Sequence, residues 1–291
     1  MALLDRAAQR LLERLRLRVR PGAVGGEPGG HRSDARANGM EFAERREYVV
    51  GDDARRIDWR AFARNRTLTV RTFEEERDAR VYVLVDVSAS MTRGAPPKLE
   101  LARQLAASFG LLGLQQVDRV QVVPFADAVE RATPVLRRRD DYPALEAFLA
   151  GLEAHGATTF DAAARSFLQR FPGRGYVVVV SDLMEAVDWG PGLGLLAQRG
   201  HQLSVVRVRC DEDHAPSFHG DLALRDAETG EVLHVAVTRA LLDAYREEVA
   251  AHVERTRDAC RRVGGRLIEA PVEVAFDQLL RQVLAPALEH P

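Results

Sequence analysis

The chain has 291 residues, with 41 Lys or Arg, 43 Asp or Glu and a formal net charge of −2. This length can form one large domain with an appendage or two small domains, and the near-balance of charge argues against a dedicated nucleic-acid binder. The two cysteines, Cys210 and Cys260, have no C-x-x-C spacing and predict neither a disulfide framework nor a zinc site. Without a transmembrane-length apolar run or a secretory signal, the sequence predicts a cytoplasmic protein.

The N-terminal region begins with a basic segment and continues into one rich in glycine and proline. Residues 1–20 predict an amphipathic basic helix over Leu3 to Val19, with leucines on one side and arginines at four-residue spacing on another. We favour packing of this helix on its own domain, and the alternative is peripheral contact with a membrane or a partner through residues 3–19. Residues 21–39 predict a flexible linker.

Residues 40–78 predict a small charge-paired appendage that contains β-strands. Strand-like pieces at Arg46 to Val50 and Thr67 to Phe73 flank a turn at residues 51–53. The ten basic and ten acidic residues between Glu41 and Arg80 favour local ion pairs over phosphate binding. Several polar or aromatic residues near the turn favour a structural clamp over a second functional surface: Tyr48, Asp52, Asp53, Arg56, Asp58 and Trp59.

Residues 79–291 alternate apolar strand patterns with helical patterns, which predicts an α/β fold with a doubly wound, mostly parallel sheet of the Rossmann type. The predicted strands are ARVYVLVDV, Arg119 to Phe125, Tyr176 to Ser181, Gln202 to Arg209 and RLIEA. Residues near 221–235 interrupt the alternation and predict a β-hairpin at the sheet edge. A long helix from about Thr238 to Val263 and a final helix ending near Leu288 complete the pattern.

Oxygen-bearing side chains gather at the predicted strand ends, where doubly wound sheets bind ligands. They are Asp86, Ser88, Ser90, Thr158 and Asp182. Hard oxygen ligands with at most two carboxylates suit Mg²⁺ or Mn²⁺. Such a set leaves a coordination position for a carboxylate from an acidic partner.

Three motifs, DVSAS, GAT before a helix and SD after an apolar strand, resemble the metal-ion-dependent adhesion site of von Willebrand factor A domains. That resemblance implies direct coordination by the hydroxyls and contact through water by the aspartates. The segment REYVVGDDARRIDW, with FEEER, KLELA and the D-x-E-T-G-E hairpin, resembles the bacterial domain-of-unknown-function family fifty-eight from about Met40 onward. This likeness implies an adaptor or co-chaperone for a MoxR-type AAA+ ATPase. Many such relatives carry two N-terminal membrane helices, which this chain lacks.

The main alternative is an enzyme, a Mg²⁺-dependent phosphotransfer hydrolase with Asp86 as nucleophile. Such a site needs a second Asp two residues on as general acid, and Ser88 occupies that position. Motifs of serine hydrolases, zincins, P-loop proteins and dinucleotide binders are missing from the sequence. We therefore expect a non-catalytic interaction module. His214 and His219, beside Asp211 and Asp213, predict a solvated loop and not a second metal site.

Overall fold

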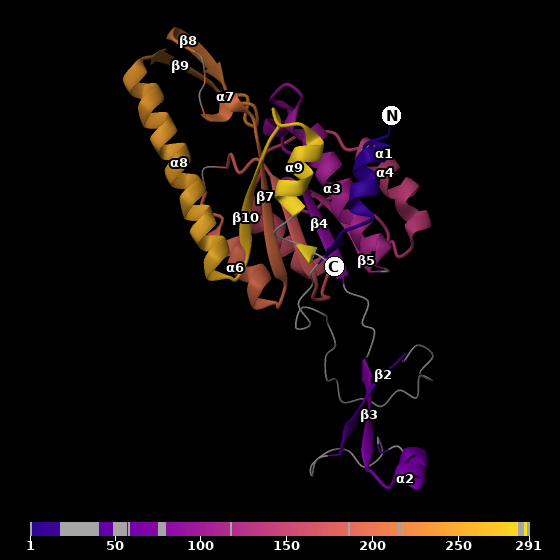
Figure 1. Cartoon of the computed structure of the whole chain (residues 1–291). Coiled ribbons are helices and arrows are strands. Elements are labelled where there is room, and N and C mark those ends of the chain that lie inside the picture. Colours follow the sequence, from indigo (N-terminus) through magenta and orange to yellow (C-terminus); the bar gives the residue numbers. More distant parts are fainter. Residues whose placement is uncertain are drawn as a thin grey trace. The chain divides into compact units, whose positions relative to one another are not determined.

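The computed structural model describes residues 2–17, 41–48, 57, 59–74, 80–116, 118–185, 187–214, 216, 218–284 and 288–289. The chain divides into two units, one made of Met1–Gly25 with Ala79–Pro291 and the other of Gly26–Asp78. The first contains the predicted α/β fold and the second the predicted appendage (Figure 1).

The central sheet of the larger unit contains five strands with parallel neighbours throughout. They are β4 (Arg80–Asp86), β5 (Arg119–Phe125), β6 (Tyr176–Ser181), β7 (Gln202–Arg209) and β10 (Arg266–Pro271). Their order is β10-β7-β6-β4-β5, so the chain moves outward from β4 to β5 and then returns to β6 on the other side of β4. This reversal confirms the doubly wound fold and creates a topological switch point between β4 and β6.

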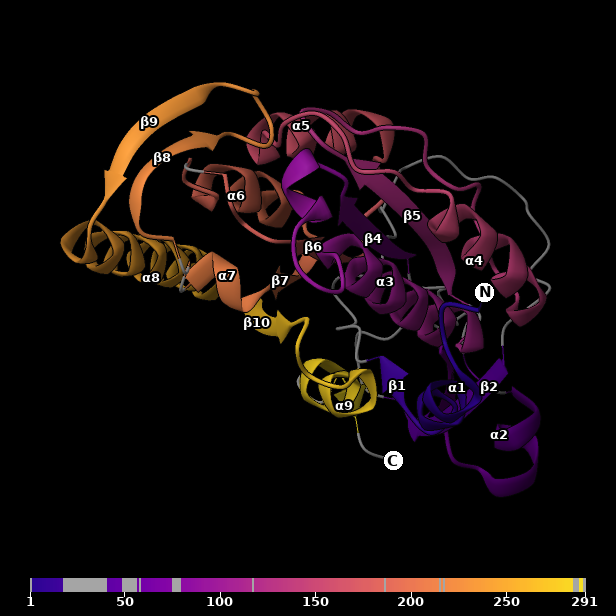
Figure 2. The same ribbon diagram turned by 90° about the horizontal axis from the view of Figure 1, so that it is seen from above.

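Helices cover both faces of this sheet because the strands are apolar on both sides. The helices of the larger unit are α1 (Arg6–Leu12), α3 (Lys98–Gln115), α4 (Tyr142–Ala150), α5 (Phe160–Arg170), α6 (Gly190–Gln198), α7 (Asp211–His214), α8 (Arg239–Arg262) and α9 (Phe276–Leu284). Helices α1, α3, α4 and α9 contribute to one hydrophobic cluster, and α5, α6 and α8 contribute to the other. Figure 2 shows α3 and α5 on opposite sides of the strands.

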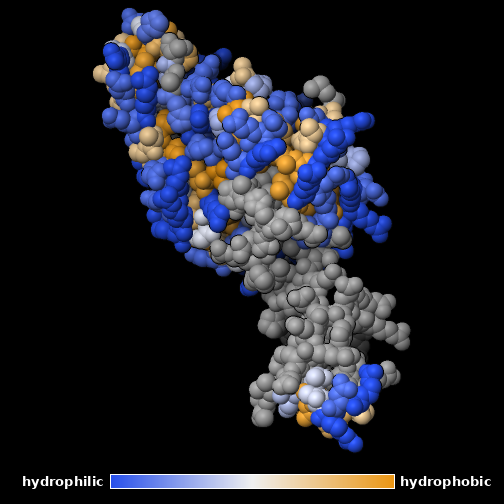
Figure 3. All heavy atoms as spheres, viewed as in Figure 1, coloured by the Kyte–Doolittle hydropathy of each residue, from blue (hydrophilic) through white to orange (hydrophobic). Residues whose placement is uncertain are grey.

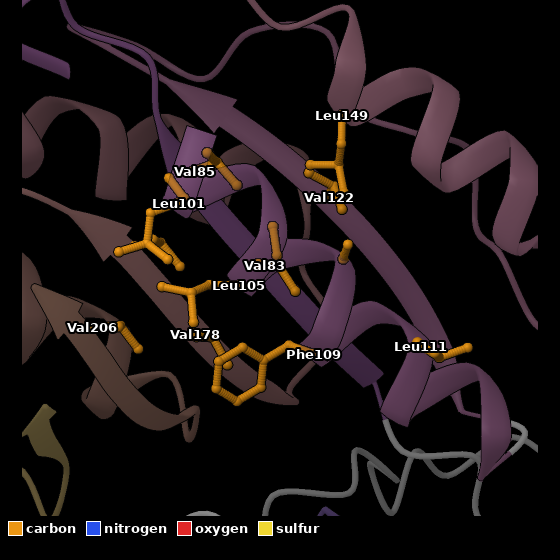
Figure 4. Packing of buried hydrophobic residues seen from close by; sticks show 14 of the residues in the cluster. Val83, Val85, Leu101, Leu105, Phe109, Leu111, Val122, Leu149, Val178 and Val206 are labelled. Carbon is orange, nitrogen blue, oxygen red and sulfur yellow. The ribbon is translucent and has the colours of Figure 1, made fainter. Parts of the chain in front are cut away.

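Alternate residues of each strand enter opposite clusters, as the period of two in a β-strand requires. Val83 packs on the α3 side and Leu84 on the α5 side, and both are fully buried. Figure 4 shows Leu105 and Phe109 of α3 packed against the sheet beside Val83. The site described below is therefore held on a sheet fixed from both faces.

The N-terminal helix is shorter than the sequence predicts, and the prediction of one helix over Leu3 to Val19 is wrong. Helix α1 spans Arg6–Leu12, and the chain then forms strand β1 (Arg16–Leu17). This strand pairs antiparallel with β11 (Leu288–Glu289), so the prediction of a final helix reaching Leu288 is also wrong. The apolar side of the α1 segment packs into its own domain, with Leu4 and Leu12 buried in the core.

The predicted hairpin is present as β8 (Gly220–Arg225) and β9 (Val232–Val237). The two strands pair only with each other in the part of the chain that the structure describes, so they form a separate sheet and do not extend the central one. Val232 and Leu233 at the start of β9 are exposed. Figure 3 shows hydrophobic spheres at this end of the molecule among mainly hydrophilic residues.

The smaller unit consists of strands β2 (Glu41–Glu47) and β3 (Thr69–Glu74), paired antiparallel, and helix α2 (Trp59–Asn65). Trp59, predicted in a turn clamp, begins α2 with an exposed fraction of 60% and contacts the Phe62 ring edge to face. Tyr48, the other described member of that set, donates its N–H to Leu68 O at 2.9 Å. The members Asp52, Asp53, Arg56 and Asp58 and the predicted linker lie outside the described residues. None of the described helices is both long and apolar enough to cross a membrane.

Candidate metal centre

The candidate centre lies at the switch point of the sheet, where β4 ends at Asp86 and β6 ends at Ser181. Backbone hydrogen bonds join the loop after β4 to the segment before α5: Ala89 N–H donates to Gly156 O over 3.0 Å and His155 N–H donates to Val87 O over 2.7 Å. Gly156 has a φ of +68°, in the left-handed region that favours glycine. This connection brings the DVSAS and GAT motifs together.

Asp86 is fully buried, and its hydrogen-bond partners among the described residues are neutral. Its carboxylate accepts from Ser88 N–H at 2.8 Å and from the hydroxyls of Thr158 and Ser181 at 3.2 Å and 2.5 Å. Burial and then repulsion by Asp182 raise the pKa of Asp86 to about 7, although hydrogen bonds from Ser181 and Ser88 act in the opposite direction. A buried carboxyl with only dipolar partners is the group that a bound cation would compensate.

The remaining hydroxyls lie in the same cluster. Ser88 Oγ is 3.0 Å from Ser90 Oγ, and both side chains are buried. Ser181 is a member that the sequence analysis missed, because it was counted as the last apolar-strand residue and not as an oxygen donor. The alternation of side chains along β6 was the available signal, since it places residue 181 on the opposite face from residue 180.

Asp182 has a charged partner within the protein. The Lys98 ammonium donates to Asp182 Oδ2 and to both carboxylate oxygens of Asp213, at 3.3 and 3.4 Å. Lys98 has no exposed surface. Burial lowers the pKa of Lys98, but Asp182 and Asp213 outweigh this effect and raise it above the usual lysine value.

This ion-pair cluster contains one residue that the sequence analysis did not identify and corrects the interpretation of another. Lys98, the only lysine in the chain, begins α3 and reaches the cluster from there. Asp213 was predicted in a solvated loop, but it lies on α7 and is buried, where it also accepts from Cys210 N–H at 3.0 Å. His214, on the same turn of helix, has its Nε2 3.2 Å from the Arg207 guanidinium.

The donor set has the chemistry of a hard-cation site. It combines the Asp86 carboxyl with the hydroxyls of Ser88, Ser90, Thr158 and Ser181. Asp182 lies beside this set. One of its carboxylate oxygens accepts from the Lys98 ammonium, and the other accepts from Met184 N–H at 3.1 Å. Among the described residues no three His, Cys, Asp or Glu side chains gather as a metal-binding group. Neutral hydroxyls outnumber carboxylates in this donor set and neither a thiol nor an imidazole belongs to it, so it suits a hard cation with few carboxylate ligands better than zinc or a carboxylate-rich calcium site.

The hairpin turn forms the rim of the centre. The Glu228 carboxylate lies 3.4 Å from Thr158 N, and Glu228 is another contributor that the sequence analysis did not identify. In Figure 2 the hairpin extends from the end of α8 past α6 toward α5. Beside the turn is a hollow of about 520 Å³, lined by residues of the hairpin and by Arg93.

Comparisons with known proteins give one family and several distant structures. Uncharacterized proteins of Mycobacterium bovis and Mycobacterium tuberculosis are each 30% identical over 257 residues, which covers 86% of this chain and 81% of theirs. The crystal structure of BatB from Bacteroides thetaiotaomicron is 17% identical, with a TM-score of 0.43 over 72% of this chain and 98% of that chain. The crystal structure of the SpRpn10 VWA domain is 11% identical, with a TM-score of 0.41 over 70% of this chain and 94% of that chain.

At this distance from solved structures, the fold assignment depends on the strand order of the chain itself. The family is established by sequence. The model of the family described as "Protein of unknown function DUF58" matches residues 44–255, including part of β2, all of β3, the candidate centre and the hairpin. The chain therefore belongs to this family, as its motifs indicated.

Proposed function

We propose that the chain is a non-catalytic protein-interaction module that holds one Mg²⁺ or Mn²⁺ and uses it to bind an acidic side chain of a partner. The observation that carries this proposal is the fully buried Asp86 carboxyl, surrounded by neutral hydrogen-bond donors at the switch point of the sheet. The residues proposed to hold the ion are Asp86, Ser88, Ser90, Thr158 and Asp182.

The chain's own residues would have distinct roles in this site. Asp86 supplies negative charge at the centre, and the hydroxyls of Ser88, Ser90 and Thr158 supply neutral oxygens that can turn their lone pairs toward an ion. Asp182 would act from the second layer, because Lys98 already binds one of its oxygens. A bound divalent cation would supply an electrophilic point of attachment for a carboxylate.

The non-catalytic part of the proposal follows from the surroundings of Asp86. Its carboxyl has no exposed surface and accepts hydrogen bonds on both oxygens, which weakens it as a nucleophile. The residue two positions on, Ser88, cannot act as a general acid. We expect phosphatase, esterase, peptidase and nucleotidase assays to remain at background, and Mg²⁺-dependent turnover that Asp86→Asn removes would restore the hydrolase alternative.

The partner is proposed from the family resemblance, which implies a MoxR-type AAA+ ATPase or its client. In that arrangement the chain serves as an adaptor or co-chaperone, and an acidic residue of the partner completes the coordination of the ion. Loss of one charge-assisted ligand from a buried interface costs about 2 to 5 kcal/mol, or roughly thirtyfold to several-thousandfold in affinity.

Calorimetry with Mg²⁺ and Mn²⁺ tests the ion site, and binding of a purified MoxR-type ATPase in Mg²⁺ or EDTA tests the partner. We expect one ion per chain in the wild type and none with Asp86→Asn, which preserves the shape of the side chain. Asp211→Asn is the matched control, because this acidic side chain on α7 is 78% exposed. Equal ion binding by wild type and Asp86→Asn would exclude the site, and ATPase binding that survives EDTA would exclude metal-dependent recognition.

A further inference from the structure

The hairpin turn holds Glu228 in a defined position. Asp226 Oδ1 accepts from the backbone N–H groups of Glu228 and Thr229 at 2.8 and 2.7 Å. Gly230, with a φ of +74°, closes the turn by donating to Asp226 O over 3.1 Å. These bonds form without the Glu228 side chain, so its position is set by the turn and its charge is available for another contact.

Glu228 turns toward the candidate centre and not toward solvent. It is half-buried, whereas Ala227 and Thr229 on either side are exposed. Its carboxylate accepts from Thr158 N–H at 3.4 Å, and Ser88 lies near it. Both residues belong to the proposed ion site.

The electrostatic surroundings of Glu228 are unfavourable for a carboxylate. Glu228 is half-buried and lies near the carboxylates of Asp182 and Asp226. Like charges gathered at a partly buried site repel one another unless a cation lies between them. The turn therefore brings a further carboxylate to the place where the proposed site needs one.

A purely structural role is the alternative, because Thr158 lies two residues before the start of α5 and a carboxylate near a helix N-terminus is stabilising. Glu185 plays that role, since its carboxylate accepts from Phe160 N–H at 3.0 Å. Burial raises the pKa of Glu185, and the charges of Glu228 and Asp161 raise it further, against the hydrogen bond from Phe160. Glu185 is therefore a comparison residue at the same helix end.

We propose that Glu228 is the chain's own carboxylate ligand for the cation, and that it occupies the position an acidic partner residue would take. This inference rests on the proposed ion site. The hairpin would then keep the free protein in a self-liganded state, and an acidic partner would bind by displacing the turn. The recognition surface would consist of the ion and the exposed Val232 and Leu233 of the moving hairpin.

The test uses Mn²⁺ as the ion and ¹³C-labelled acetate as the carboxylate probe. Mn²⁺ affinity of the full chain is measured by calorimetry, and acetate bound to the ion is detected by electron-nuclear double resonance of the Mn²⁺ signal. Glu228→Gln removes the charge but keeps a carbonyl that can accept from Thr158 N–H. The controls are Glu231→Gln, an exposed residue of the same hairpin, and Glu185→Gln at the same helix end.

We expect Glu228→Gln to bind Mn²⁺ roughly tenfold or more weakly, because ligand charge sets the affinity of such sites, and to admit acetate that the wild type excludes. Both controls should match the wild type in affinity and in exclusion of acetate. If Glu228→Gln binds Mn²⁺ as well as wild type and still excludes acetate, Glu228 only caps the helix and the inference is overturned while the ion site stands. If wild type binds no Mn²⁺, the proposed function fails first and the inference with it.

Discussion

Replacing Lys98 with methionine should strongly destabilise the larger unit, because it leaves Asp182 and Asp213 buried without their shared cation. Both carboxylates contact the Lys98 ammonium, and all three side chains are at most 5% exposed. Removing one partner of a buried pair costs about 3 to 5 kcal/mol of unfolding free energy. In a unit of this size that corresponds to a fall in Tm of roughly 6 to 20 °C.

Urea unfolding at pH 7 in EDTA measures this loss. Arg246→Met is the matched control, because Arg246 forms an exposed ion pair with Asp243 and should change the free energy of unfolding by less than about 0.5 kcal/mol. Adding Asp182→Asn and Asp213→Asn to Lys98→Met should recover most of the lost stability, since the unpaired charges are then gone. A loss below about 1 kcal/mol for Lys98→Met, or no recovery in the triple variant, would refute the reasoning.

Two further predictions concern packing and protonation. Burial lowers the pKa of His201 to about 4, so the unfolded chain takes up a proton that the folded chain excludes, and wild-type stability should fall as the pH drops from 6.5 toward 4. Urea unfolding at pH 7 and pH 4.5 should show this loss of unfolding free energy, which is at most about 3 kcal/mol. The loss should be smaller in His201→Phe. If the variant loses as much stability as the wild type between these pH values, the lowered pKa of His201 is refuted. A methyl group on Gly113 would lie 2.6 Å from Val120 Cγ2, a stiff buried side chain, so Gly113→Ala should cost about 1 to 3 kcal/mol in thermal unfolding. Gly194→Ala, with open space around the new methyl group, should instead raise the free energy of unfolding by up to about 1 kcal/mol. If both substitutions raise the stability, α3 does not pack as closely as described.

The central sheet could be predicted from sequence because its strands are buried on both faces and form continuous apolar runs. Strands β6 (Tyr176–Ser181) and β7 (Gln202–Arg209) have the predicted bounds. The N-terminal helix could not be bounded in the same way. It ends where β1 pairs with β11, more than 270 residues further along the chain, and no local pattern around Leu12 carries that information.

The same distinction applies to the candidate centre. Asp86 and Asp182 were found because a doubly wound fold places strand ends together, whatever lies between them in sequence. Three further residues reach the centre from other elements: Lys98 from a helix start, Asp213 from a short helix and Glu228 from a hairpin turn. A charged residue is ordinary at each of these positions, so the sequence around it gives no sign of a role in the centre. Their charges acquire a partner only through tertiary contacts, which is why spacing alone does not predict them.

Within the proposed site, Lys98 and Glu228 would set how strongly the ion is held. The Lys98 ammonium lies on the Asp182 side and already neutralises part of the buried negative charge there. Asp86 is then the main uncompensated carboxyl, and one carboxylate with neutral hydroxyls binds a divalent cation weakly. Firm binding would therefore require a further carboxylate, from Glu228 in the free protein or from a partner in the complex. A site that is incomplete without that carboxylate couples ion binding to partner binding, because each supplies part of the free energy that the other needs.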